Sequence, residues 1–137
     1  MFHAKNYIKV TSLEEAYELN QKKSNAIIGG MLWLKMSNRN MHTAIDLSGL
    51  GLDKIEEQED AFSIGCMCTL RQLEIHEALN RYFGGAMKAC TRHIVGTQFR
   101  NGATVGGSIF GRFGFSDILT CLLALDTYVE LYHAGVM

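Results

Sequence analysis

The sequence contains no proline and only one tryptophan among its 137 residues. Without proline, the tight turns of the chain must be made by glycine, asparagine and aspartate. Glycine is abundant, with 14 residues, and glycine turns are also places where the backbone can approach a ligand closely. The glycine-rich turns are therefore the expected place for a binding site.

Long apolar runs and basic charge are lacking as well. No run approaches the roughly 20 residues that a membrane helix needs, and residues 1–6 contain no apolar signal-peptide core. The formal net charge is −1, so there is no basic excess to attract nucleic acid or an anionic membrane. The length and the hydrophobic share of 47% fit one packed domain. We expect a cytoplasmic domain that binds neither nucleic acid nor membrane.

Motifs for metal binding and nucleophilic catalysis are also missing. The cysteines form no C-x-x-C pair and the five histidines are too scattered to form a metal pair. Free cysteine is among the most buried residue types, so buried, reduced thiols are the expected state of Cys66, Cys68, Cys90 and Cys121. No Ser-His-Asp or Cys-His arrangement follows from the spacing. We expect neither a metal ligand nor a catalytic residue in this chain.

Strand and helix signals alternate through the first part of the chain. The Ser12–Glu15 segment is a capping box that predicts a helix start, and residues 25–28 form a short apolar strand that ends at Gly29-Gly30. In open α/β sheets, ligands bind at the carboxyl ends of strands, where this glycine pair lies. The other elements predicted here are a strand at 7–10, helical turns at 31–36 and a strand at 43–47.

A break at residues 48–51 is a plausible boundary between two lobes. Beyond it, Thr69–Gln72 is a second capping box, and Ser116-Asp117 resembles a helix start. The elements predicted in this part are a hairpin of 54–57 with 61–68, a helix from Thr69 to about residue 80, a helical candidate at 86–95, an extended glycine-punctuated stretch at 96–110, a helix at 118–125 and a strand at 128–132.

Two glycine segments, 26–32 and 100–109, are the candidates for binding chemistry. A double glycine after a strand lets successive backbone N–H groups point at one anion. Hydrogen bonds to a charged oxygen contribute roughly 1.5–3 kcal/mol each, so a phosphate held this way needs no lysine. The alternative is that both segments are simply sharp turns, because neither matches G-x-G-x-x-G or a P-loop.

The stretch from Arg100 to Leu131 is similar to the flavin-binding segment of medium subunits of the molybdenum hydroxylase family, which includes xanthine dehydrogenase and carbon monoxide dehydrogenase. The family pattern is Arg-Asn, then Ala-Thr-Ile-Gly-Gly-Asn-Ile, Ser-Asp, and Ala-Leu-Asp-Ala-x-Val-Glu-Leu after a leucine-rich helix. The corresponding residues here are Arg100-Asn101, Ala103 to Ile109, Ser116-Asp117 and Ala124 to Leu131, without a gap. The family's earlier Ala-Gly-Gly-Thr-Asp-Leu corresponds to Ile28 to Trp33.

The departures from this pattern remove side-chain donors. Met31 and Leu32 replace a threonine and an acidic residue, and Ser108 replaces an asparagine. Phe113 and Gly114 stand where the family has a small residue and proline, and Arg112 is an unusual charge in that loop. Backbone N–H donors survive these changes, so the resemblance implies FAD binding with lower affinity or a reshaped loop.

The resemblance implies an α+β fold, a two-lobed FAD-binding domain of the PCMH (vanillyl-alcohol oxidase-like) type over residues 1–137, with lobes of about 1–52 and 53–137. The family polypeptide continues further, so we expect this chain to lack the C-terminal part. FAD is the expected cofactor, with its pyrophosphate between the two glycine loops. The implied cofactor-binding residues are Ile28, Gly29, Gly30, Met31, Leu32, Trp33, Ala103, Thr104, Gly106, Gly107, Ser108, Ile109, Ser116 and Asp117.

The resemblance also implies an oxidoreductase subunit that passes electrons from iron–sulfur clusters through FAD to NAD or another acceptor. Its partners would be a molybdopterin-binding large subunit and an iron–sulfur small subunit, and the isolated chain would be inactive. Two alternatives stay open. The chain is a non-catalytic fragment or degenerate docking subunit with little or no flavin, or it is another flavoenzyme of the same fold, such as a sugar-nucleotide reductase or an oxidase.

Two residues have competing interpretations. Trp33 lies beside the first glycine loop, where it would either pack on flavin or adenine or fill the core between helix and sheet. Asp117 would accept a hydrogen bond from a ribitol or ribose hydroxyl, as the resemblance implies, or take part in helix capping, and both roles are compatible.

Overall fold

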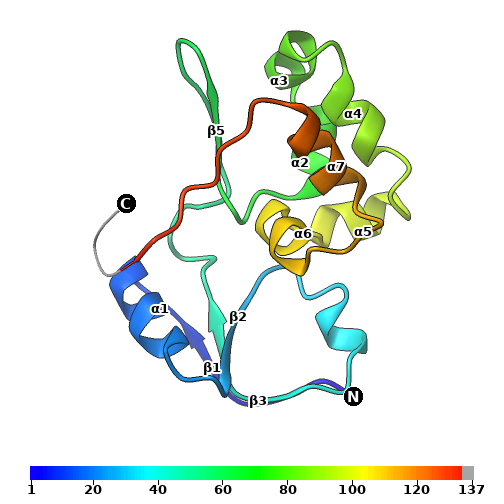
Figure 1. Cartoon of the computed structure of the whole chain (residues 1–137). Helices are drawn as coiled ribbons and strands as arrows, with labels where there is room; N and C mark the ends of the chain where they lie inside the picture. The colour runs from blue at the N-terminus through cyan, green and yellow to red at the C-terminus, as the bar shows by residue number, and fades with distance from the viewer. Residues whose placement is uncertain (134–137) are drawn as a thin grey trace.

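The computed structural model describes residues 1–133, and its first part forms a three-stranded parallel sheet (Figure 1). Both outer strands pair with the central strand, so all three carboxyl ends lie at one edge of the sheet. This confirms the predicted strand–helix–strand unit and leaves Gly29 and Gly30 at that edge. The strands, in the order β1-β3-β2, are β1 (His3–Lys9), β2 (Asn25–Ile28) and β3 (Asn40–Asp46).

Helix α1 (Leu13–Asn20) begins at the predicted cap. The Ser12 hydroxyl accepts a hydrogen bond from the backbone N–H of Glu15 at 3.1 Å. The Glu15 carboxylate reaches past the predicted box and accepts from the backbone N–H of Thr11 at 2.8 Å. The short 3-10 turn η1 (Leu34–Met36) follows the glycines, within the range predicted for helical turns.

The rest of the chain is the predicted hairpin followed by a series of short helices. Strands β4 (Ile55–Glu57) and β5 (Phe62–Ile64) pair antiparallel. The second predicted capping box is complete, because the Thr69 hydroxyl accepts from the Gln72 N–H while the Gln72 side chain accepts from the Thr69 N–H. The helices are α2 (Leu70–Ile75), α3 (Glu77–Tyr82), α4 (Ala86–Thr91), α5 (Thr97–Gly102), α6 (Val105–Gly111) and α7 (Asp117–Ala124).

The single helix predicted from Thr69 to about residue 80 is in fact two helices. His76 has an extended backbone, with ψ 109°, and this ends α2. Its imidazole Nδ1 accepts a hydrogen bond from the Leu79 N–H at 3.1 Å, so His76 caps the start of α3. The His76 side chain thus satisfies a backbone N–H at the start of α3, and α2 ends at Ile75 instead of continuing.

The prediction of an extended stretch at 96–110 is wrong, because these residues form α5 and α6. Glycine is a poor helix former, so local propensity does not favour a helix in this segment. Its helices are fixed by other contacts: Thr104 caps α6, and the first N–H groups of α6 bond to carbonyls of residues 66 and 68. Packing against another segment therefore overrides the local preference.

The strand predicted at 128–132 is also wrong for the described structure, in which these residues are extended but belong to no sheet. The segment runs from α7 back toward α1 (Figure 1), where the Tyr132 hydroxyl bonds to the Glu14 carboxylate at 2.9 Å. The rings of Tyr17 and Tyr132 meet edge to face, 6.0 Å apart. Residues 134–137, the end of the predicted second lobe, lie outside the described residues.

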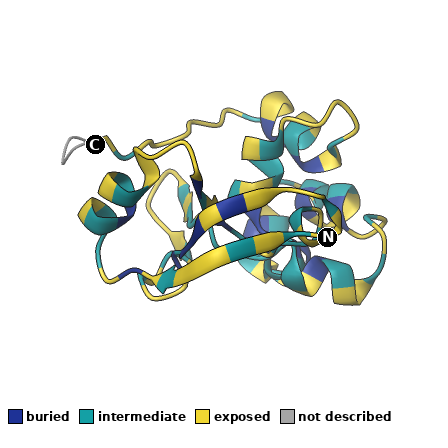
Figure 2. Ribbon diagram, turned by 90° about the horizontal axis from the view of Figure 1, so that it is seen from below, coloured by how far each residue is buried: buried dark blue, intermediate teal, exposed yellow. Residues whose placement is uncertain are grey.

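Buried side chains gather in three clusters. The central strand β3 is buried along most of its length, whereas β1 is largely exposed (Figure 2). Two clusters lie against the sheet, around Ile45 and around Met41, and the third lies among the helices, around Leu73. The lobe boundary near residue 52 stays a prediction.

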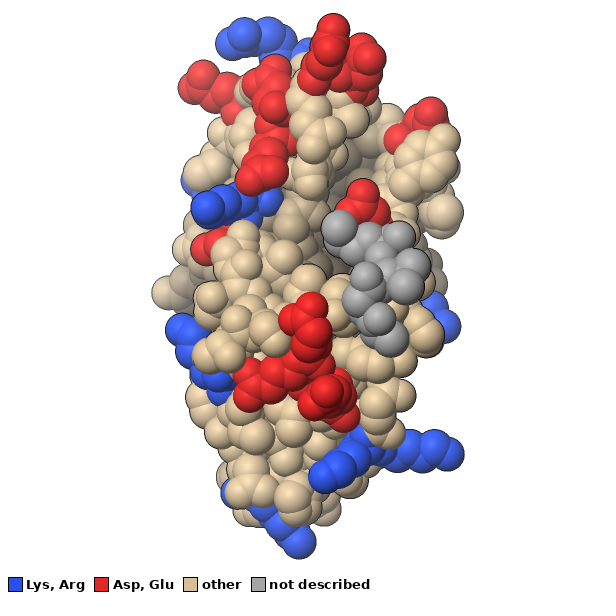
Figure 3. All heavy atoms as spheres, turned by 90° about the vertical axis from the view of Figure 1, so that its left-hand side faces the viewer, with Lys and Arg blue, Asp and Glu red and all other residues tan. Residues whose placement is uncertain are grey.

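Charge is unevenly distributed on the surface. The face shown in Figure 3 carries two groups of acidic side chains, and the acidic elements on that side are α1, with Glu14 and Glu15 in its first turn, and the β4–β5 hairpin. Acidic residues in a first turn suit the positive end of a helix dipole. Over residues 1–133 no helix combines the length and apolar character needed to cross a bilayer.

Candidate functional site

The first glycine loop, Gly29 to Trp33, offers a run of unused backbone donors. Within residues 1–133, none of its five backbone N–H groups donates to another group of the chain. Met31 adopts a positive φ of 61°, which is uncommon for a residue with a side chain and changes the direction of the backbone here. Successive free N–H groups at the carboxyl edge of a parallel sheet are suited to an anion.

The two glycine loops contact each other directly, as the sequence predicted they would face each other. A Cβ atom on Gly30 would lie 1.5 Å from the carbonyl oxygen of Gly102. A Cβ on Gly29 would lie 2.5 Å from the Thr104 hydroxyl. Because real side chains cannot approach so closely, only glycine at these positions allows the loops to meet.

The second glycine loop differs from the first in how its backbone donors are used. The N–H groups of Val105 and Gly106 donate to the carbonyls of Cys68 and Cys66, both at 2.8 Å. The Gly107 N–H donates to the Thr104 hydroxyl at 3.2 Å. These hydrogen bonds hold the start of α6 in place. Of the two glycine loops, only the first therefore has a run of backbone N–H groups without an acceptor in the described chain.

Residues 66–70 support the second loop, a role that sequence reasoning missed. Besides accepting from α6, this segment donates from the Leu70 N–H to the Ala103 carbonyl at 2.9 Å, and Thr69 forms a bridge with Thr104. A Cβ on Gly106 would lie 2.8 Å from the Cys66 carbonyl oxygen, so the two backbones are in close contact. The capping box at Thr69 was the available signal, but it predicted only the start of a helix.

A buried ion pair fixes the helix that precedes the second loop. Arg100 Nε lies 2.7 Å from Glu74 Oε2, and both side chains are only 7% exposed. The guanidinium also donates to the Ile94 carbonyl at 3.1 Å. The hydrogen bond from Arg100 is the main reason why the pKa of Glu74 lies below its ordinary value; burial opposes this shift and Arg71 adds to it. The sequence indicates Arg100 only as part of a motif.

Trp33 is half exposed and contacts rings from other segments. Its ring centroid lies 5.8 Å from that of Phe99 on α5, and 6.1 Å from those of Phe113 and Phe115 between α6 and α7. The alternative that Trp33 fills the core between helix and sheet is therefore wrong. The tryptophan instead belongs to an aromatic group at the surface, beside the free N–H groups.

Several other predicted site residues have structural roles. Ile28, the last residue of β2, is buried in the cluster around Met41, and the Leu32 side chain faces Gly102. Ala103 and Ile109 pack against the helical core, and the Ser108 hydroxyl donates to the Thr104 carbonyl at 3.0 Å. Their side chains shape the loops rather than offer donors to a ligand.

Ser116 and Asp117 lie at the start of α7. The Ser116 hydroxyl caps the helix by accepting from the Leu119 N–H at 3.2 Å, and Asp117 is an exposed residue of the first turn. Among the described residues neither side chain forms a hydrogen bond or ion pair with the first loop, although the ring of the neighbouring Phe115 lies 6.1 Å from that of Trp33. The capping interpretation of this pair is thus present in the structure, and a role toward a cofactor hydroxyl stays a prediction.

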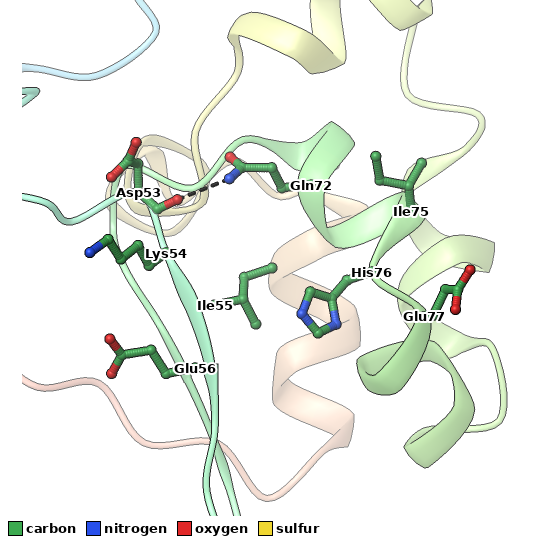
Figure 4. Close-up of a pocket in the computed structure, with 8 residues that line it drawn as sticks. All are labelled: Asp53, Lys54, Ile55, Glu56, Gln72, Ile75, His76 and Glu77. Atoms are coloured by element: carbon green, nitrogen blue, oxygen red, sulfur yellow. Dashed lines mark hydrogen bonds between the residues drawn. The ribbon is translucent and has the colours of Figure 1, made fainter.

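A hollow of about 610 Å³ lies elsewhere, between β4 and the α2–α3 corner (Figure 4). The Gln72 amide crosses one end of it and donates to the Asp53 carbonyl at 2.9 Å. A smaller hollow of about 220 Å³ shares Asp53 and Gln72. Neither includes a residue of the glycine loops, so the candidate site is a surface site rather than one of these hollows.

All four cysteines are free, but only Cys68 is buried, and the expectation of burial is wrong for the exposed Cys66. Cys66 lies beyond the end of β5, where the turn to Thr69 opens it to solvent. Burial, together with a hydrogen bond to the Cys121 thiol, raises the pKa of Cys90 to about 12, which keeps it protonated and unreactive. Among residues 1–133 no three His, Cys, Asp or Glu side chains gather as a metal site.

Comparison with known proteins gives a match along almost the whole chain. Residues 2–136 match the family model described as the FAD binding domain in molybdopterin dehydrogenase. The nicotine 6-hydroxylase medium subunit of Paenarthrobacter nicotinovorans is 31% identical over 131 residues, which cover 91% of this chain and 46% of that protein. YgfM of Escherichia coli K12, whose function is uncharacterized, is 29% identical over 124 residues, covering 88% of this chain and 46% of that protein.

The fold of the chain is also similar to that of a solved structure. The carbon monoxide dehydrogenase of Hydrogenophaga pseudoflava superposes with a TM-score of 0.68 at 23% identity, covering 76% of this chain and 38% of that one. This likeness confirms the α+β fold of an FAD-binding domain. The chain spans about half the length of the curated relatives it matches.

Proposed function

Because the chain belongs to the family of FAD-binding domains of molybdopterin dehydrogenases, we propose that its Gly29–Trp33 loop holds the pyrophosphate of FAD. FAD is the cofactor of this family. The observation that carries the proposal is the run of five backbone N–H groups that have no acceptor within residues 1–133, at the carboxyl end of β2. Charge-assisted hydrogen bonds from backbone amides bind phosphate oxygens strongly and need no cationic side chain.

The second glycine loop acts in this proposal as a support. Its own first N–H groups are engaged, but its backbone closes against Gly29 and Gly30 and so fixes the first loop from the other side. Arg100 fixes the second loop in turn through Glu74. The cofactor-binding part of the chain is thus pre-organised by contacts within the protein, which lowers the entropy lost on binding.

The residues of this chain bind and orient the cofactor, and FAD supplies the redox chemistry when it is bound. We assign no acid or base to the described residues. We propose that the chain serves as the flavin part of a larger oxidoreductase and is inactive alone. Its partners would be a molybdopterin-binding large subunit and an iron–sulfur small subunit, with NAD or another acceptor downstream. The relative named a medium subunit supports an assembly of several subunits.

A second candidate function is a docking subunit that binds little or no flavin. The observation that favours it is the engagement of the Val105, Gly106 and Gly107 donors, which leaves the second loop without free N–H groups there. Met31 and Leu32 also offer no polar side chain beside the first loop. The two candidates differ in one measurable property, the affinity of the chain for FAD.

The test is equilibrium dialysis of the purified chain against FAD, with Gly30→Ala as the variant and Gly96→Ala as its control. A methyl group at Gly30 collides with the Gly102 carbonyl, whereas at Gly96, where the backbone is extended with φ −141°, no atom lies within 4 Å of the added Cβ. We expect Gly30→Ala to weaken FAD binding by about tenfold or more, with unchanged binding in the control. Absence of FAD binding by the wild-type chain would favour the docking candidate.

A further inference from the structure

The aromatic group around Trp33 is made by three separate segments of the chain. Trp33 ends the first glycine loop, Phe99 lies on α5, and Phe113 and Phe115 lie between α6 and α7. The Phe113 and Phe115 rings are stacked, with centroids 5.2 Å apart and planes 15° apart. Trp33 is inclined to both, at 52° and 63°. The four rings therefore form one contiguous group.

This aromatic group is open to solvent. Trp33 is 50% exposed, Phe113 40% and Phe115 69%. Large aromatic rings bury 150–250 Å² each when they are covered, so leaving them in water forgoes much apolar burial. Contiguous exposed apolar surface of this kind is typical of a binding site.

The backbone of residues 111–114 holds these rings in place. Arg112 ends α6 in the left-handed conformation, with φ 49°, and turns the chain back. A Cβ on Gly111 would lie 2.7 Å from the Phe113 ring, so the ring lies directly over this glycine. Local contacts with Gly111 and the turn at Arg112 therefore set the position of Phe113.

The occupant follows from what lies beside the rings. Trp33 is both the ring that contacts Phe99, Phe113 and Phe115 and the last residue of the free N–H run. The N–H groups that can bind an anion and the aromatic rings thus lie next to each other. A dinucleotide has the matching chemistry, because its pyrophosphate is joined to flat heteroaromatic rings, whereas a simple phosphate or an apolar peptide would use only half of this surface.

We propose that Trp33, Phe113 and Phe115 form a stacking surface for one flat ring of FAD, either adenine or isoalloxazine. This inference rests on the proposed function and adds to it the residues that recognise a ring. Stacking of a base on an aromatic side chain is worth roughly 1–3 kcal/mol per ring by alanine substitution. The phosphate donors fix the position of the dinucleotide, and the rings favour it over smaller phosphates.

The test is FAD affinity of the full chain by equilibrium dialysis for Phe113→Ala and Phe115→Ala. Phe110→Ala is the matched control, because Phe110 is 77% exposed in the same region and, within residues 1–133, its ring contacts Arg112 rather than Trp33. We expect roughly 5- to 100-fold weaker binding in the two variants and wild-type binding in the control. Circular dichroism checks that each variant is folded.

The single tryptophan gives a second readout that a structural role would not change. ADP does not absorb the emission of Trp33, so quenching of that emission by ADP indicates adenine on the ring, and FMN affinity reduced by the same variants indicates isoalloxazine. Either result supports the inference. Wild-type FAD affinity in both folded variants overturns the stacking surface and leaves the proposed function standing, whereas a wild-type chain that binds no FAD overturns both.

Discussion

Arg112 and Met31 occupy backbone conformations that favour glycine, at φ 49° and 61°. Both lie in segments that form the candidate site, one after α6 and one in the first glycine loop. Strained backbone persists where surrounding contacts determine it, and it is more frequent at ligand sites than elsewhere. Arg112 is the clearer of the two for a test, because its side chain is exposed, whereas Met31 also packs against the cluster around Met41.

We predict that Arg112→Gly stabilises the chain. The left-handed conformation costs a residue with a side chain roughly 1–2 kcal/mol, and this gain is partly offset by the greater freedom of glycine in the unfolded state. A net rise of about 0.5 kcal/mol in the free energy of unfolding is expected, measured by urea titration. Arg92→Gly is the control, because Arg92 ends α4 with φ −57° and glycine there should lower stability. Destabilisation by both changes would contradict the strain at Arg112.

The roles of single residues could be predicted from sequence only where they depend on near neighbours. Ser12, Thr69 and Ser116 cap their helices as the sequence indicates, because each bond reaches three residues along the chain. The glycines of the two loops were also predicted as a site. That Gly30 is required by the Gly102 carbonyl was not predictable, because this contact joins residues more than 70 positions apart.

Helices α2 and α5 are joined by the Glu74–Arg100 pair, whose two side chains are each only 7% exposed. We predict that Glu74→Gln lowers the free energy of unfolding by about 3 kcal/mol, because it leaves the buried Arg100 charge without its partner. Urea titration measures this change. Glu18→Gln on the exposed side of α1 is the control and should alter stability by less than about 0.5 kcal/mol. A small effect at Glu74 would mean that the pair is not needed to hold α5.

The same pair predicts a pH dependence. The pKa of Glu74 is lowered in the folded chain, chiefly by the hydrogen bond from Arg100. A lowered folded pKa contributes stability that is present above the unfolded value of about 4.3 and is lost as the pH falls through the folded pKa. The free energy of unfolding should therefore decline below about pH 5, and Glu74→Gln should reduce that decline. Parallel pH profiles for the variant and the wild type would contradict this assignment.

Two elements show why local sequence does not decide every helix and strand. Residues 96–110 are rich in glycine, which predicts extended chain, yet they form α5 and α6, and bonds to residues 66–68 hold the start of α6. Residues 128–132 have the composition of a strand, but a strand requires a partner, and no sheet within residues 1–133 includes them. In both cases the deciding contacts lie far away in the sequence.

The contact between the two glycine loops connects the sheet to the helices. The clusters around Ile45 and Met41 lie on one side of it and the cluster around Leu73 on the other. A cofactor held at that contact would touch both parts of the molecule and stabilise them together. By linkage, FAD at about 100 times its dissociation constant would add roughly 2.7 kcal/mol to the free energy of unfolding.

In the molecule as a whole, the segment 126–131 has apolar side chains that are exposed and backbone groups that lack hydrogen-bond partners in the described chain. Val129 is 58% exposed and Leu131 76%, and no backbone group of this segment is hydrogen-bonded within the described chain. An extended segment with unpaired N–H and C=O groups readily adds to the edge of another sheet. The free edges of the short β4–β5 hairpin and of the parallel sheet are available for such pairing in a second copy.

We therefore predict that the isolated chain self-associates and that the double change Val129→Lys with Leu131→Lys reduces it. These two side chains lie on one face of the extended segment, so two charges there oppose burial against another chain. Glu130→Lys, on the opposite face, is the matched control and should associate like the wild type. Sedimentation velocity over a range of concentrations measures the effect. If the wild-type chain stays monomeric at about 100 μM, where contacts of moderate affinity are populated, the segment is not an association surface for copies of this chain.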